Sequence, residues 1–243
     1  MYQTANLYLS PDMKMAEVVL NNPYLMLLLE HFGISAPLQE KTIREICDEH
    51  KLHPEVFLTF ANLYNGVDYK PAERFTHREV RSIINYLSNS HSYYLAEIYP
   101  NILKLIQEMF RDKSQPEQAM VEKFFNNYFD EVREHLNYEN EIVFPYITKL
   151  YQKIEQRGNV NLPDTYSVAD YQDHHDDIEE KLTDLTNLLV KYLPNNDEQQ
   201  IRRKLLFTLF ELDYDLTIHS KIEDQILIPL VQQMENYLSR KTT

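Results

Sequence analysis

The amino-acid sequence predicts an all-α protein, an antiparallel four-helix bundle preceded by a small helical domain. Three observations indicate this fold. Glycine occurs only three times, so the turn and bulge residues that a many-stranded β fold needs are scarce. Apolar residues recur at three- and four-residue steps, as in LTDLTNLLVKYL (182–193), which is typical of amphipathic helices. The long periodic segments are joined by short polar stretches, which favours antiparallel neighbours.

Residues 1–70 are predicted to form the small domain, built from short helices with breaks between them. A helical segment that starts near residue 15 is expected to end at Gly33, because glycine commonly terminates helices. Pro37 and Pro54 stand where the first turns of two further helices are expected. The stretch VDYKPAER (67–74) is predicted to link this domain to a second one, residues 71–243.

Four long helices are predicted in residues 71–243. The first two begin at capping-box patterns, THRE (76–79) and SQPE (114–117), and the second is expected to run to about residue 156. The polar stretch RGNVNLPDTY (157–166) is predicted to be a loop. A third helix is expected from about residue 167 to about residue 193, and a fourth from PNNDE (194–198) almost to the last residue.

The charge balance and the apolar runs exclude several classes of partner. Twenty-four basic and thirty-eight acidic side chains give a net charge of −14, and no basic stripe stands out, so a nucleic-acid partner is not expected. The longest apolar stretch, 24–29, is far too short to span a bilayer, and the opening residues lack the features of a signal peptide. The single cysteine, Cys47, cannot form an internal disulfide. We therefore expect a cytoplasmic protein without a membrane partner.

A motif of the form H-x3-E-x5-P is written twice. It reads HLNYENEIVFP at 135–145 and HSKIEDQILIP at 219–229. An isoleucine also recurs at the same offset, as Ile142 and Ile226. Residues four apart on a helix share a face, so each histidine meets the glutamate of its own motif. Such a pair offers nitrogen and oxygen donors to one edge of a transition-metal ion, and iron, manganese and zinc all accept this donor set.

Two further histidines obey the same offset of 84 residues. His91 lies 44 residues before His135, and His175 lies 44 residues before His219. The rival His174 breaks the register by one residue, which turns a helical side chain by roughly 100°. A single H-x3-E pair on a helix is usually a surface feature, but the duplication with matched histidines favours a metal site. The predicted ligands are His91, His135, Glu139, His175, His219 and Glu223.

Glu131 and Asp215 also obey the offset, each one turn before the histidine of a motif. They could orient the imidazoles by accepting a hydrogen bond from the N–H of the second ring nitrogen, or they could be exposed acids on a solvated face. The sequence leaves both interpretations open.

Pro145 and Pro229 each remove a backbone hydrogen bond and are expected to bend their helices. Core packing is the default interpretation of two tyrosines that could also line the pocket, Tyr94 and Tyr138. The remaining histidines are expected to be ordinary surface or boundary residues, namely His31, His50, His53 and His77.

The arrangement of one histidine, H-x3-E, a second histidine and a second H-x3-E on four successive helices resembles the hemerythrin-like cation-binding domain. The resemblance covers roughly residues 76–240 and includes the proline after each motif. It implies a non-haem di-iron centre with an oxo or hydroxo bridge, in which the histidines are terminal ligands and Glu139 and Glu223 bridge both irons. Manganese or zinc are the alternative metals.

The N-terminal segment, with LLEHFGIS (28–35) and TIREICDEHKLHPEVFL (42–58), resembles the small domain of the iron–sulfur cluster repair di-iron proteins. Those proteins carry a cysteine pair after the Gly-Ile element, whereas Gly33 and Ile34 are followed here by Ser35, Ala36 and Pro37. Cys47 lies on the next helix and does not replace the pair, so a thiol-dependent step is in doubt.

The resemblance implies a role in iron–sulfur cluster repair and in nitrosative or oxidative stress. The implied partners are a diatomic ligand or peroxide and damaged iron–sulfur proteins, and a homodimer is left open. The alternative is a module that binds or senses dioxygen or nitric oxide without catalytic turnover, so whether the protein is an enzyme stays open. A bundle whose histidines bind zinc adventitiously is the third interpretation.

Overall fold

The computed structural model describes residues 7–35, 37–68, 75–110, 116–155, 166–173, 178–192 and 199–242. Every regular element in these ranges is helical, and their one strand-like pairing is an isolated bridge between Lys14 and Thr42. The all-α prediction is therefore confirmed. Within the same ranges, no helix combines the length and apolarity needed to cross a membrane. Residues 157–165 of the predicted loop and residues 69–74 of the predicted linker lie outside the described residues.

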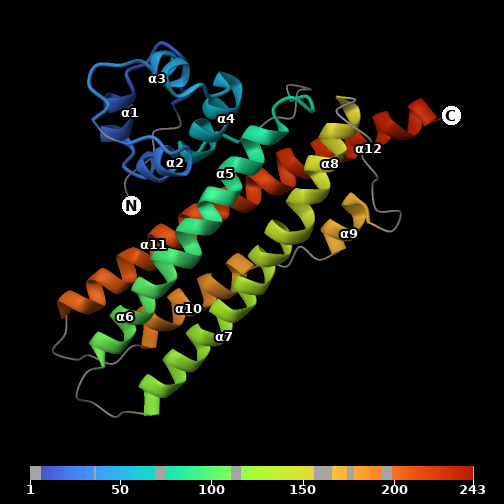
Figure 1. The fold of residues 1–243 in the computed structure, drawn as a ribbon. Coiled ribbons are helices and arrows are strands. Elements are labelled where there is room, and N and C mark those ends of the chain that lie inside the picture. The colour runs from blue at the N-terminus through green and yellow to red at the C-terminus, as the bar shows by residue number, and fades with distance from the viewer. Residues whose placement is uncertain are drawn as a thin grey trace.

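Four short helices at the N-terminus gather against one end of the long helices (Figure 1). They are α1 (Met15–Asn21), α2 (Leu25–His31), α3 (Ile43–His50) and α4 (Pro54–Tyr64). The predicted helix end at Gly33 is confirmed, since Gly33 has a φ of +71° and Ile34 N–H donates to Leu29 O at 2.8 Å. Pro54 begins α4 as predicted.

The helix that was expected to begin at Pro37 begins later, at Ile43 of α3, so that prediction was wrong. Thr42 is its N-cap, and a full capping box with Glu45 satisfies the first free N–H groups. Because this capping box starts the helix at Ile43, Pro37 belongs to the preceding loop.

Four long runs of helix follow, and they lie side by side (Figure 1). The first comprises α5 (Val80–Tyr93), η1 (Tyr94–Ile98) and α6 (Tyr99–Met109). The second comprises α7 (Pro116–Tyr138), η2 (Glu139–Val143) and α8 (Phe144–Ile154). The third comprises two separate helices, α9 (Val168–Asp173) and α10 (Ile178–Tyr192), and residues 174–177 between them lie outside the described residues. The fourth comprises α11 (Gln199–Ile222), η3 (Glu223–Leu227) and α12 (Ile228–Thr242). In space, α6 packs against α7 and α11, α10 packs against the same two helices, and α12 packs against α8.

Three of these runs contain one π-helical turn, and each turn ends just before a proline. Phe144 N–H donates to Glu139 O, and Ile228 N–H donates to Glu223 O, both five residues back. Pro145 and Pro229 follow directly, and a proline can neither donate to the carbonyl four residues back nor pack against it. The wider turn resolves this conflict, and the helix continues past each proline. The bend expected at Pro145 and Pro229 stays a prediction.

The buried side chains form two hydrophobic clusters. The first combines α1–α4 with α5, η2, α8, α9, the end of α11, η3 and α12, and the second lies among η1, α6, α7, α10 and α11. Along α11, Leu216 belongs to the second cluster and Ile222 to the first, with His219 between them. The division of the chain into domains at residues 70 and 71 stays a prediction.

Candidate metal centre

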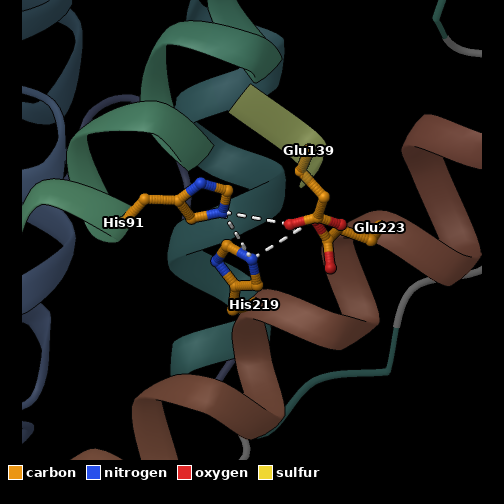
Figure 2. Close-up of side chains that lie close together, drawn as sticks. All are labelled: His91, Glu139, His219 and Glu223. Atoms are coloured by element: carbon orange, nitrogen blue, oxygen red, sulfur yellow. Dashed lines mark hydrogen bonds and ion pairs between the residues drawn. The ribbon is translucent and has the colours of Figure 1, made fainter. Parts of the chain in front are cut away.

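Four polar side chains converge between the two hydrophobic clusters (Figure 2). They are His91, Glu139, His219 and Glu223, all of them buried, and one donor atom of each lies within 4.8 Å of the others. They come from α5, the start of η2, the end of α11 and the start of η3. Burying this many ionisable groups in an apolar interior is costly unless something binds there.

The spacing of the donor atoms fits ligands of a single ion. His91 Nε2 lies 3.3 Å from His219 Nε2 and 3.4 Å from Glu139 Oε2, and His219 Nε2 lies 3.3 Å from Glu223 Oε1. Two ligand atoms bound at about 2.1 Å in tetrahedral geometry stand about 3.4 Å apart. The gaps are thus close to those that a shared ion would set.

The hydrogen bonds of His91 leave Nε2 available to a metal. Its Nδ1 lies 3.0 Å from Asn140 Oδ1, and because an amide oxygen can only accept, Nδ1 carries the proton. Burial, followed by the nearby His219, lowers the pKa of His91 to about 3, so the ring is neutral with a lone pair on Nε2. Phe144 stacks on the ring at a centroid distance of 5.4 Å.

His219 is held in the same tautomer by a different group. Ser90 Oγ donates to Leu87 O at 2.8 Å and lies 3.0 Å from His219 Nδ1. A hydroxyl has one proton, so Ser90 accepts from His219 Nδ1–H, and Nε2 again keeps its lone pair. The two Nε2 lone pairs therefore face each other and the carboxylates, an arrangement that a cation stabilises.

One carboxylate oxygen of the group, Oε2 of Glu139, lacks a hydrogen-bond donor. Glu139 Oε1 accepts a hydrogen bond from Tyr171 O–H at 2.8 Å, whereas its Oε2 is buried and accepts none. Burial, and next the neighbouring Glu223, hold the pKa of Glu139 well above its usual range in the metal-free protein. A cation between the two carboxylates would remove both penalties. The residues present therefore fit a metal ion.

The structure thus brings together four of the six side chains predicted as ligands. His135 lies beside the group, with Nε2 3.5 Å from Glu139 Oε1, and is almost fully buried. His175 and its rival His174 lie outside the described residues. The assignment of all six as ligands stays a prediction, and the four-donor group alone supports binding of one metal ion of unspecified identity.

Asp215 differs from both of its predicted roles. It is fully buried, and His219 Nδ1 bonds to Ser90 instead. His31, expected at the surface or a boundary, is 1% exposed and places Nε2 2.8 Å from Asp215 Oδ2. Glu131 is exposed. The other expectations hold, since His50 is exposed and His53 and His77 are half-buried.

Sequence reasoning missed the residues that orient the donors. Ser90 and Asn140 are neighbours in sequence of His91 and Glu139, but each contacts a residue on another run of helix. Tyr171 lies on α9 and is buried. One signal could have found Tyr171, because it stands four residues before the predicted ligand His175, the spacing at which helical side chains share a face. Tyr94 is buried in the second hydrophobic cluster, and Tyr138 packs against the first, in agreement with the default interpretation.

Comparison with known proteins adds no family to these observations. No family model matches the chain, and no curated protein matches it in a search of sequences. The donor set itself indicates the metals that suit it, because two imidazoles and two carboxylates accept iron, manganese or zinc.

Proposed function

We propose that this chain is a non-haem di-iron protein of the hemerythrin-like class, with its long helices arranged as an antiparallel four-helix bundle. The observation that supports metal binding is the convergence of four buried donors whose histidine protons are held on the far ring nitrogen. A second iron would use His135 and His175, with Glu139 and Glu223 shared between the two irons. The dinuclear count and the choice of iron follow from the repeated motif and its resemblance.

The proposed role is iron–sulfur cluster repair and defence against nitrosative and oxidative stress in the cytoplasm. Bound iron would supply an exchangeable coordination position for nitric oxide, dioxygen or peroxide. The residues of the chain would orient the imidazoles through Ser90 and Asn140, donate a hydrogen bond to Glu139 from Tyr171, and exclude water by burial. Damaged iron–sulfur proteins are the proposed macromolecular partners.

One observation favours a second candidate, a module that binds or senses a diatomic ligand without turnover. The N-terminal segment lacks a cysteine pair after Gly33 and Ile34, and its single thiol, Cys47, is buried. Burial raises the pKa of that thiol to about 12, so it is protonated and unreactive at neutral pH. Consumption of more than one equivalent of nitric oxide or peroxide per site would exclude a pure binder.

The deciding experiment is the metal content of the purified protein, followed by anaerobic titration of the metal-free chain with Fe²⁺. We expect close to two irons per chain, and Glu139→Ala or Glu223→Ala should abolish the dinuclear spectrum while leaving the helix content intact. Glu141→Ala is the matched control, because Glu141 is exposed on the same π turn as Glu139. Two coupled irons in Glu139→Ala would refute the bridging role, and zinc or no metal in the native protein would remove the redox proposal.

A further inference from the structure

A buried carboxylate that is not among the proposed ligands lies one turn before His219 on α11. Asp215 Oδ2 lies 2.8 Å from His31 Nε2 and accepts a hydrogen bond from Tyr94 O–H at 2.8 Å, and Oδ1 accepts one from Tyr64 O–H. Two of these three partners come from the N-terminal helices, His31 from α2 and Tyr64 from α4. The buried charge is thus satisfied mainly by a segment distant in sequence.

This contact breaks the symmetry of the repeated motifs. The residue equivalent to Asp215 in the first copy, 84 positions earlier, is Glu131, and it is exposed. The repeated isoleucine differs in the same way, since Ile226 is 3% exposed and Ile142 is 45% exposed. Ile226 belongs to the hydrophobic cluster that includes the N-terminal helices. The contacts of Asp215 and Ile226 are therefore not reproduced at Glu131 and Ile142, although Val143 and Phe144 of the first copy also belong to that cluster.

Asp215 reaches the metal centre through Tyr94. The Tyr94 ring packs edge-on against His219, with a centroid distance of 5.7 Å and an interplanar angle of 70°. Its hydroxyl is held by Asp215, so the position of the ring depends on that carboxylate. A second hydrogen bond also links α2 to α5, because Asn89 Nδ2 donates to His31 O at 2.8 Å. Asn89 is the sequence neighbour of Ser90, which orients His219. Residue His31 of α2 therefore contacts both helices that carry the histidine donors.

We propose that His31 and Asp215 form a positioning pair through which the N-terminal segment sets the metal affinity of the His91 and His219 side of the centre. This inference rests on the proposed metal binding. Removing His31 leaves a buried carboxylate without its hydrogen-bond partner on α2, which favours water entry or rotation of Asp215. Tyr94 then loses its anchor, and His219 loses the packing that fixes its ring. Residues that orient ligands in this way change metal affinity by roughly 10–100-fold.

The test measures Fe²⁺ affinity of the full chain under anaerobic conditions, by competition with a chelator. His31→Ala is expected to weaken binding by roughly tenfold, at the lower end of the range for such residues because the route passes through Tyr94. His31→Gln, whose amide can still donate to Asp215, is expected to recover most of the affinity. The Co²⁺ absorption spectrum at full loading should shift in His31→Ala and return in His31→Gln, which a loss of stability alone would not produce.

His53→Ala is the matched control. His53 Nε2 lies 3.2 Å from Glu79 Oε1, so this pair also ties the N-terminal segment to the start of the first long run, but it contacts no proposed ligand. We expect unchanged Fe²⁺ affinity. Equal losses in His31→Ala and His53→Ala would overturn the specific route through Asp215, as would wild-type affinity in His31→Ala.

A further variant keeps the test available if His31→Ala does not fold. Tyr94→Phe removes only the hydroxyl that contacts Asp215 and keeps the ring, and it should also weaken Fe²⁺ binding. Wild-type affinity in Tyr94→Phe would overturn the proposal. A wild-type chain that fails to bind Fe²⁺ overturns the proposed function itself, whereas tight wild-type binding that no variant changes overturns only the positioning role.

Discussion

At the scale of single residues, Glu139 shows the conflict between folding and binding. The fold buries this carboxylate near Glu223, and burial holds the pKa of Glu139 above its usual range. We predict that Glu139→Gln stabilises the metal-free protein at pH 7, by roughly 1–3 kcal/mol, because burial opposes ionisation of the carboxyl group, whereas the amide is neutral without taking up a proton. The amide oxygen can still accept a hydrogen bond from Tyr171. Thermal unfolding should show this gain, and added Fe²⁺ should raise the Tm of the wild type only. A less stable metal-free variant would contradict this account.

Asp215 makes the free energy of unfolding depend on pH. Burial raises the pKa of Asp215, but the charge of His31 and the hydrogen bonds from His31, Tyr64 and Tyr94 outweigh burial and lower it below its ordinary value of 3.8. An acid with a depressed pKa in the folded state contributes stability above its ordinary pKa and loses it as the pH falls. We predict that Asp215→Asn costs on the order of 3 kcal/mol at pH 7 and less below pH 3.8. Denaturant unfolding across this pH range measures the difference in the free energy of unfolding between the wild type and Asp215→Asn. A difference that does not change with pH would contradict this prediction.

Cys47 provides a third test at the residue level. Its side chain is completely buried and its pKa is raised to about 12, so almost no thiolate forms near neutral pH. We predict that a thiol reagent leaves the folded protein unlabelled and reacts with one equivalent after unfolding in denaturant. Labelling of the folded chain at the rate of a small-molecule thiol would show that this cysteine is accessible, and would reopen a thiol-dependent role for the N-terminal segment.

At the scale of elements, the π turns place Glu139 and Glu223. Each glutamate is the first residue of a π turn that precedes a proline. We predict that Pro145→Ala or Pro229→Ala lets the turn relax toward α-helical hydrogen bonding, because alanine restores the missing donor. Fe²⁺ affinity should fall roughly tenfold, as expected when a residue that orients ligands is lost, while helix content is kept. Pro54→Ala, at the start of α4, is the control that should leave the affinity unchanged.

The elements also show what sequence patterns can and cannot predict. The repeated H-x3-E motif was sufficient to find Glu139, His219 and Glu223, because residues four apart on a helix must meet. The common offset found His91, since a repeated structure repeats its spacings. The pairing of His31 with Asp215 could not be found in this way, because a contact between α2 and α11 depends on how distant segments pack. The predicted start of α3 was wrong for a local reason, because the structure begins this helix at the capping box of Thr42 and Glu45 and not at Pro37.

At the scale of the whole molecule, one hydrophobic cluster joins the N-terminal helices to the long ones. It includes Phe57 and Phe60 of α4, Leu87 of α5 and Leu150 of α8. Separating the N-terminal segment from the long helices would expose side chains on both sides of this cluster. We therefore predict one cooperative unfolding transition for the whole chain. Hydrogen exchange of the buried amides of α4 and α8 should report the same free energy of opening. Opening of α4 at much lower free energy would separate the segment from the bundle, and would then predict that the support of His219 by His31 is intermittent.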